Sequence, residues 1–129
     1  MIHTPKGVLV VVEDEATVRL LLTETLKDGC YAVEEAANGT EGLALVTRYG
    51  DACRLVISDV IMPGMSGPAM VQRLRSSMPN VKVLFLSGYA GDFLRENGIT
   101  EDVEFLQKPV LPDVLLKKVD ELLHPPSTI

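Results

Sequence analysis

The sequence predicts an α/β fold in which a doubly wound parallel sheet of five strands carries helices on both faces. Short apolar segments such as Val8–Val12 and Leu55–Ile57 contain no alternating polar residues. This pattern is typical of strands buried on both faces. Segments with apolar residues at helical spacing follow these strands in turn, and such alternation favours a parallel sheet.

The overall composition indicates an ordinary globular chain of 129 residues, 47% hydrophobic and 23% charged. We expect one domain over residues 1–129, with a core at about residues 6–123 and short flexible ends. The net charge of −6 argues against direct nucleic-acid binding, which needs a basic surface. The apolar runs are too short to cross a membrane, and no signal peptide is evident. Cys30 and Cys53 are isolated, so we expect buried or half-buried thiols in a cytoplasmic protein.

The strands and helices follow one another along the whole chain. Strands are expected at residues 8–12, 31–36, 55–59, 81–86 and 103–106. Helices are expected after Asp14, at residues 42–48, from Ser66 to before Pro79, around Phe93–Leu94, and from Pro112 to before Pro125. Asp14 and Ser66 are candidate N-caps, and Gly29 is expected to end the first helix. The inner face of that helix is predicted to hold Val18, Leu21, Leu22, Thr25 and Leu26.

Asp59 lies at the end of the most central apolar segment. The following residues, Met62-Pro63-Gly64-Met65, predict a turn, because proline presets φ and glycine accepts a positive φ. In open parallel sheets, ligands bind at the carboxyl ends of the strands. Asp59 is therefore a candidate functional residue.

Other polar residues are predicted to share that edge of the sheet. Glu13 and Asp14 follow the first strand, Ser87 follows the fourth and Lys108 follows the fifth. Three carboxylates held together repel one another, so a cation is needed to offset their charge. Mg²⁺ binds such carboxylates while keeping several waters. A carboxylate nucleophile, a metal, a lysine and a hydroxyl together suit phosphoryl transfer through an acyl phosphate.

Four motifs stand in order at the predicted strand ends. They are Glu13-Asp14, Asp59-Val60-Ile61-Met62-Pro63-Gly64-Met65-Ser66-Gly67, Ser87-Gly88-Tyr89-Ala90 and Lys108-Pro109. Together they resemble the receiver domain of two-component response regulators, over about residues 6–123. The resemblance implies a CheY-like, flavodoxin-like sheet with strand order 2-1-3-4-5 and five helices. The stretch from Ser87 to Ala90 resembles receivers attached to hybrid histidine kinases, although a stand-alone regulator stays open.

The resemblance also implies a role for each site residue. Asp59 would accept a phosphoryl group from a histidine kinase or a histidine phosphotransfer protein. Mg²⁺ would be held by Glu13, Asp14, Asp59 and the backbone carbonyl of Ile61. Lys108, joined to Pro109 by a cis peptide bond, would pair with the phosphoryl group. Ser87 would be the switch hydroxyl and Phe105 the switch aromatic.

On this interpretation the chain is a signalling switch, with no separate substrate to turn over. Phosphorylation would change the face formed by the fourth helix, the fifth strand and the fifth helix, which a partner or a second copy of the chain would bind. Departures from the usual pattern are Glu13 for aspartate, Ser87 for threonine and Phe105 for tyrosine. The cognate kinase, the output and the lifetime of the phosphoryl group stay open.

Three alternatives were weighed against this interpretation. An aspartate-dependent phosphohydrolase would need a second aspartate at position 61, which is isoleucine. A flavodoxin-like cofactor binder would need a phosphate-binding loop where Glu13-Asp14-Glu15 places three acids. A degenerate receiver used only for docking would not need the acids, Ser87 and Lys108.

Overall fold

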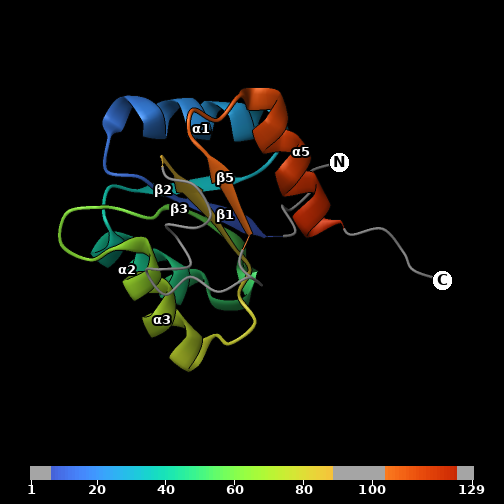
Figure 1. Cartoon of the computed structure of the whole chain (residues 1–129). Helices are drawn as coiled ribbons and strands as arrows, with labels where there is room; N and C mark the ends of the chain where they lie inside the picture. Colours follow the sequence, from blue (N-terminus) through green and yellow to red (C-terminus); the bar gives the residue numbers. More distant parts are fainter. Residues whose placement is uncertain (1–6, 89–103, 125–129) are drawn as a thin grey trace.

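The chain folds into a five-stranded sheet between two layers of helices (Figure 1). The computed structural model describes residues 7–88 and 104–124. The strands are β1 (Val8–Val12), β2 (Val33–Ala36), β3 (Cys53–Asp59), β4 (Val83–Ser87) and β5 (Glu104–Gln107). The helices are α1 (Ala16–Asp28), α2 (Gly39–Tyr49), the 3₁₀ helix η1 (Gly50–Ala52), α3 (Gly67–Ser77) and α5 (Pro112–Leu123).

All strand pairs are parallel, and the strand order is β2-β1-β3-β4-β5. This confirms the predicted fold class and order. The carboxyl ends of all five strands therefore meet at one edge of the sheet. The helix expected around Phe93–Leu94 lies outside the described residues, and the other four predicted helices are present.

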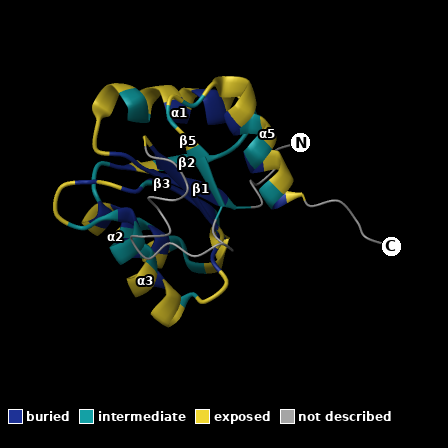
Figure 2. Ribbon diagram, viewed as in Figure 1, coloured by how far each residue is buried: buried dark blue, intermediate teal, exposed yellow. Residues whose placement is uncertain are grey.

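The helices cover the two faces of the sheet in pairs, α1 with α5 and α2 with α3 (Figure 1). Successive side chains of a strand point to opposite faces. Accordingly, Leu55 and Ile57 of β3 join the core on the α1–α5 side, whereas Val56 joins the core on the α2–α3 side. β1 and β4, the neighbours of β3, are thus buried throughout (Figure 2). Each fully buried aliphatic side chain stabilises the fold by about 1.5–3 kcal/mol.

The helix starts confirm one predicted cap and correct another. Ser66 caps α3, because its Oγ accepts a hydrogen bond from the Ala69 N–H at 3.2 Å. The prediction that Asp14 caps α1 is wrong. The N-cap position is Glu15, and no side chain caps the helix there. The Glu15 N–H instead donates to Glu13 Oε2 at 3.2 Å, so the residue before Asp14 provides the acceptor.

Several boundaries differ from those predicted from the sequence. α2 starts at Gly39 rather than residue 42, because Asn38 accepts a hydrogen bond from the Glu41 N–H and so caps the helix earlier. β2 and β4 each begin two residues later than expected. Leu21 is 57% exposed, so it lies outside the inner face of α1.

The two cysteines are unpaired, but only Cys53 is buried. Burial raises the pKa of the Cys53 thiol to about 11, which keeps it protonated near neutral pH. The expectation of a buried or half-buried thiol is wrong for Cys30, which is exposed in the turn after α1. Its φ of 71° places it in the left-handed region.

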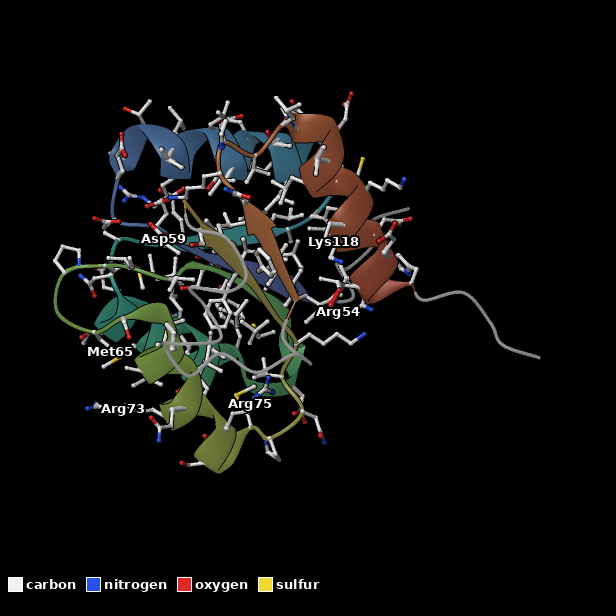
Figure 3. All side chains as sticks on the ribbon, in the orientation of Figure 1. Arg54, Asp59, Met65, Arg73, Arg75 and Lys118 are labelled. Carbon is white, nitrogen blue, oxygen red and sulfur yellow. The ribbon has the colours of Figure 1, made fainter. Side chains whose placement is uncertain are left out.

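The last turn of α5 is fixed at the amino edge of the sheet. Lys82 Nζ donates to the Leu122 carbonyl at 2.6 Å, and Arg54 donates to the Leu123 carbonyl at 3.4 Å. Figure 3 shows Arg54 and Asp59 at opposite ends of β3. These cations satisfy carbonyls that a helix end leaves without internal partners. Within the described ranges, no helix is long and apolar enough to cross a membrane.

Candidate functional site

An acidic cluster lies at the carboxyl edge of the sheet, as the sequence predicted. Glu13 and Asp14 directly follow β1, and Asp59 is the last residue of β3. One carboxylate oxygen from each lies within 4.8 Å of the others. Glu13 is buried, Asp59 is partly buried and Asp14 is exposed. The three acids therefore face one point from two adjacent strands.

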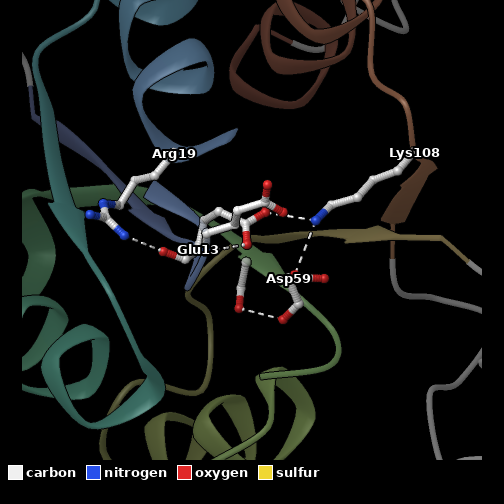
Figure 4. A network of polar contacts seen from close by, with 6 residues as sticks. Glu13, Arg19, Asp59 and Lys108 are labelled. Carbon is white, nitrogen blue, oxygen red and sulfur yellow. Dashed lines mark hydrogen bonds and ion pairs between the residues drawn. The ribbon is translucent and has the colours of Figure 1, made fainter. Parts of the chain in front are cut away.

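Lys108 provides the positive charge that this cluster needs. Its Nζ lies 2.7 Å from Glu13 Oε1 and 3.0 Å from Asp59 Oδ2 (Figure 4). Burial alone would lower the pKa of the Lys108 ammonium, but the hydrogen bonds and charges of the two acids outweigh it, so the pKa is raised. The Lys108–Pro109 peptide bond is cis, as expected from the sequence.

Every polar atom of Glu13 has a hydrogen-bond partner. Its N–H donates to the Ala36 carbonyl at 3.1 Å, and its carbonyl accepts from Arg19 at 2.8 Å. Oε2 accepts from the Glu15 N–H, and Oε1 accepts from Lys108. A buried carboxylate is tolerated only with such partners. Glu13 is consequently fixed in position.

The backbone at Asp59 and Val60 is held by two small residues. Ser58 Oγ donates to the Asp59 carbonyl at 2.8 Å. The Gly67 N–H donates to the Val60 carbonyl, and a Cβ at Gly67 would lie only 2.3 Å from the Asp59 carbonyl oxygen. The start of α3 can approach the phosphoacceptor candidate this closely only because residue 67 is glycine.

The turn after Asp59 has the predicted form. Gly64 adopts a φ of 78°, which glycine accepts without steric cost. Met62 is buried, and Ile61 is 52% exposed beside the acidic cluster. The Ile61 side chain therefore faces solvent at the rim of the site.

Ser87 lies in β4, the strand next to β3, and Phe105 lies in β5, the outermost strand on that side. Ser87 is buried at the end of β4, and its carbonyl accepts the Lys108 N–H at 2.7 Å. Phe105 of β5 is partly buried, pairs in register with Phe85, and packs against the α2–α3 core. The structure thus brings Ser87 to the same edge as the acids, whereas Phe105 lies further from that edge.

Sequence reasoning missed Arg19, Ser58 and Gly67. Arg19 follows Glu13 by six residues, and a cation so close in sequence to Glu13 and Asp14 was the available signal. Gly67 closes the motif that begins at Asp59, but a close backbone approach is visible only in three dimensions. Ser58 resembles any small strand residue in the sequence.

This arrangement can bind a hard cation and stabilise negative oxygens. Carboxylate oxygens are the ligands that Mg²⁺ prefers, and it needs only a few of them. Glu13, Asp14 and Asp59 fit this requirement in type and spacing. Lys108 adds a fixed positive charge on the Asp59 side. An anionic group at Asp59 would therefore meet a cation without any large rearrangement.

Comparison with known proteins gives the same result over most of the chain. The sequence profile of the response regulator receiver domain matches residues 9–120. Sensor kinase CckA of Brucella abortus is 39% identical over 117 residues, which is 90% of this chain and 12% of that protein. The uncharacterized transcriptional regulatory protein YrkP of Bacillus subtilis is 34% identical, over 86% of this chain and 47% of that protein. The chain thus spans less than half of these relatives.

Solved structures agree with the sequence matches. The crystal structure of the receiver domain from the hybrid histidine kinase CckA superposes with a TM-score of 0.79 at 35% identity, covering 92% of this chain and all of that one. The chemotaxis protein CheY4 of Vibrio cholerae superposes with a TM-score of 0.80 at 31% identity, covering 91% of this chain and 98% of that one. These matches give no support to a phosphohydrolase. With its parallel sheet, its acidic edge and its matched profile, the chain belongs to the response regulator receiver domain family of two-component signal transduction.

Proposed function

We propose that Asp59 is the phosphoacceptor of this receiver domain. The observation that carries the proposal is the group of three carboxylates within 4.8 Å at the carboxyl edge, with Lys108 bonded to two of them. Asp59 is the acid in this group that combines partial exposure with a direct contact to Lys108. It is thus accessible to a donor and already placed beside a compensating cation.

The chemistry is a transfer from phosphohistidine to a carboxylate. A carboxylate oxygen of Asp59 attacks phosphorus, the P–N bond to the donor breaks, and the imidazole leaves. The product is an acyl phosphate. Lys108 Nζ lies 3.0 Å from Asp59 Oδ2. Its positive charge would pair with the negative oxygens of the phosphoryl group as that group is transferred to Asp59.

Glu13, Asp14, Asp59 and the backbone carbonyl of Ile61 are proposed to hold Mg²⁺. When bound, Mg²⁺ offsets the charge of the phosphoryl oxygens and of the acids. Glu13 Oε1 is now bonded to Lys108, so ion binding requires Lys108 to share or release that oxygen. The exposed carboxylate of Asp14 supplies a ligand from the solvent side.

Ser87 and Phe105 are proposed to form the switch. The phosphoryl group would draw the Ser87 hydroxyl, and Phe105 on the neighbouring strand would follow. A Ser87→Ala variant should accept phosphate normally, yet NMR signals of Phe105 should no longer shift on phosphorylation. Phe105 signals that shift as in the wild type would contradict this role.

The donor is proposed to dock on exposed apolar side chains around the site. Large hydrophobic residues at least 45% exposed lie on α1, after β3 and at the start of α5; they are Leu20, Leu21, Ile61, Leu111 and Val114. These segments all follow strand ends at the acidic edge, so a helical protein presenting a phosphohistidine to Asp59 would cover them. We infer a histidine kinase or a histidine phosphotransfer protein as this partner.

A comparison of two donors tests this docking surface. A Leu21→Gln variant should be labelled by phosphoramidate as fast as the wild type. Its labelling by the phosphorylated kinase portion of the Brucella abortus relative should be about tenfold slower, since one apolar anchor contributes about 1.4 kcal/mol or more. Equal rates from the kinase would refute the surface and leave the phosphoacceptor proposal untouched.

Residues 1–129 are proposed to be one receiver domain, either a stand-alone regulator or the receiver of a hybrid kinase such as the CckA relative. A homodimer through the helix expected around Phe93–Leu94, β5 and α5 stays a prediction, because residues 93–94 lie outside the described residues. A cytoplasmic location likewise stays a prediction.

Phosphorylation by a small donor tests the central proposal. With phosphoramidate and Mg²⁺, the protein should gain one phosphoryl group by intact mass, and hydroxylamine should remove it. Asp59→Asn should gain none, whereas Asp51→Asn, an exposed aspartate in η1, should be labelled like the wild type. Labelling that persists in Asp59→Asn would overturn the assignment. Chelation of the metal should suppress labelling in the wild type.

A further inference from the structure

Arg19 contacts the backbone of the acidic cluster, whereas Lys108 contacts its carboxylates. Arg19 Nη1 donates to the Glu13 backbone carbonyl at 2.8 Å (Figure 4). Arg19 Nε lies 3.6 Å from Glu35 Oε1 on β2. The Arg19 side chain is 19% exposed, against 48% for Glu35. The guanidinium thus links α1, the end of β1 and the edge strand.

The bond to the Glu13 carbonyl has a direct effect on the next residue. The Glu13 carbonyl and the Asp14 N–H belong to one planar peptide group. A hydrogen bond that holds this oxygen therefore fixes the plane from which the Asp14 side chain projects. Glu13 itself has other partners for its N–H and both carboxylate oxygens.

Asp14 depends on that plane more than Glu13 does. Its carboxylate is exposed, and no hydrogen bond or ion pair reaches it from residues 7–88 or 104–124. Within these described ranges, its backbone and its own rotamer therefore decide where the carboxylate points. Losing the Arg19 bond would let the peptide group rotate and spread the positions that Asp14 occupies.

We propose that Arg19 is a positioning residue for metal binding, which fixes the Glu13–Asp14 peptide so that the Asp14 carboxylate faces the Mg²⁺ position. This inference rests on the proposed Mg²⁺ site. Partners of metal ligands commonly change metal affinity by 10–100-fold when they are removed.

Charge and positioning make opposite predictions for Arg19, and this allows a clear test. A guanidinium near the site repels a second cation, so removing it would tighten Mg²⁺ binding if charge alone mattered. If positioning dominates, removing it weakens binding. The direction of the change in Kd separates the two roles.

Isothermal titration of the full chain with Mg²⁺ alone is the experiment. Arg19→Met keeps the apolar stem and should raise the Kd about tenfold. NMR of Asp14 should show a broader distribution of its side-chain carboxyl signal. Glu35→Gln removes only the outer partner of Arg19 and should keep the Kd within about twofold. Lys82→Met, which loosens the distant end of α5, controls for general destabilisation and should leave the Kd unchanged.

Each outcome has one meaning. A wild-type protein that takes up no Mg²⁺ overturns the proposed metal site itself. A wild type that binds Mg²⁺ together with an Arg19→Met variant that binds equally well or more tightly overturns the positioning role alone. Weaker Mg²⁺ binding by Lys82→Met would show that the affinity for Mg²⁺ follows the stability of the fold. It would therefore also overturn the role of Arg19.

Discussion

Lys108 is the residue on which the electrostatics of the acidic edge depend. It contacts Glu13, which is buried, and Asp59, which is partly buried. Removing one partner of a buried charge leaves the other charge without compensation, which is more costly than the bond itself. The lysine therefore contributes to stability as well as to the proposed transfer.

A Lys108→Met variant should be less stable than the wild type by about 1–3 kcal/mol at pH 7. The pKa of Lys108 is raised above its ordinary 10.5 in the folded protein. The stabilisation is thus complete below pH 10.5 and is lost as the pH rises through the folded-state pKa. Urea unfolding at pH 8 to 11 should show that the difference in free energy of unfolding between the wild type and Lys108→Met narrows only above about pH 10.5.

The matched control is Lys117→Met, an exposed lysine on α5. Its stability should stay parallel to that of the wild type across the same pH range. If the stability difference between Lys108→Met and the wild type disappeared well below pH 10, the assigned ion pairs would be contradicted.

Gly67 is the second residue with a sharp prediction. A Cβ there would lie 2.3 Å from the Asp59 carbonyl oxygen and 3.0 Å from Phe85 Cε1. Gly67→Ala should destabilise the protein by about 1–3 kcal/mol and slow labelling of Asp59, because the backbone of Asp59 must move. Thermal unfolding and phosphoramidate labelling measure both effects. Among the described residues, a Cβ at Gly88 meets nothing within 4 Å, so Gly88→Ala should unfold like the wild type.

At the scale of one element, α1 contains two buried threonines in different situations. Thr25 Oγ1 donates to the Leu21 carbonyl at 2.8 Å. Thr23 Oγ1 is buried and has no hydrogen-bond partner in the described part of the chain. An unsatisfied buried hydroxyl is costly, and a methyl group of similar shape is not.

Thr23→Val should therefore stabilise the protein by about 1 kcal/mol. Thr25→Val makes the same chemical change but breaks a hydrogen bond, so it should be neutral or destabilising. The urea midpoints of the two variants, at unchanged m-values, give the comparison. A lower midpoint for Thr23→Val would show that its hydroxyl has a partner after all.

Element types were easier to predict from the sequence than element ends. The continuous apolar strands and their alternation with helical segments were sufficient for the fold class, whereas the strand order came from the resemblance to receiver domains. The start of α2 depends on the Asn38–Glu41 hydrogen bond, and the start of α1 on Glu13 rather than Asp14. Such choices between neighbouring acceptors are decided by tertiary position, which local patterns do not contain.

At the scale of the whole molecule, the candidate site was predictable because topology gathers strand ends. Parallel order brings Glu13, Asp59 and Lys108 together although they are far apart in sequence. The supporting contacts of Arg19, Ser58 and Gly67 were not predictable, because each is made to a backbone group whose position is set by the tertiary fold.

The domain should fold without Mg²⁺, because Lys108 already offsets part of the acidic charge. Mg²⁺ at about ten times its Kd would add only about 1.4 kcal/mol of stability through binding to the folded state. Thermal unfolding in chelator should therefore stay cooperative, with a midpoint a few degrees lower. A chain that loses its helical circular dichroism in chelator would contradict this expectation.

Because the last turn of α5 is anchored, we expect the helix to move mainly at its first turn. Arg54 and Lys82 hold its end at the amino edge, while its first turn follows Lys108 at the opposite edge. Over its length of about 18 Å, a shift of about 1 Å at the first turn becomes a tilt of about 3°. Phosphorylation-induced NMR shifts should accordingly decrease along α5 from Pro112 to Leu123, so that the helix pivots instead of sliding.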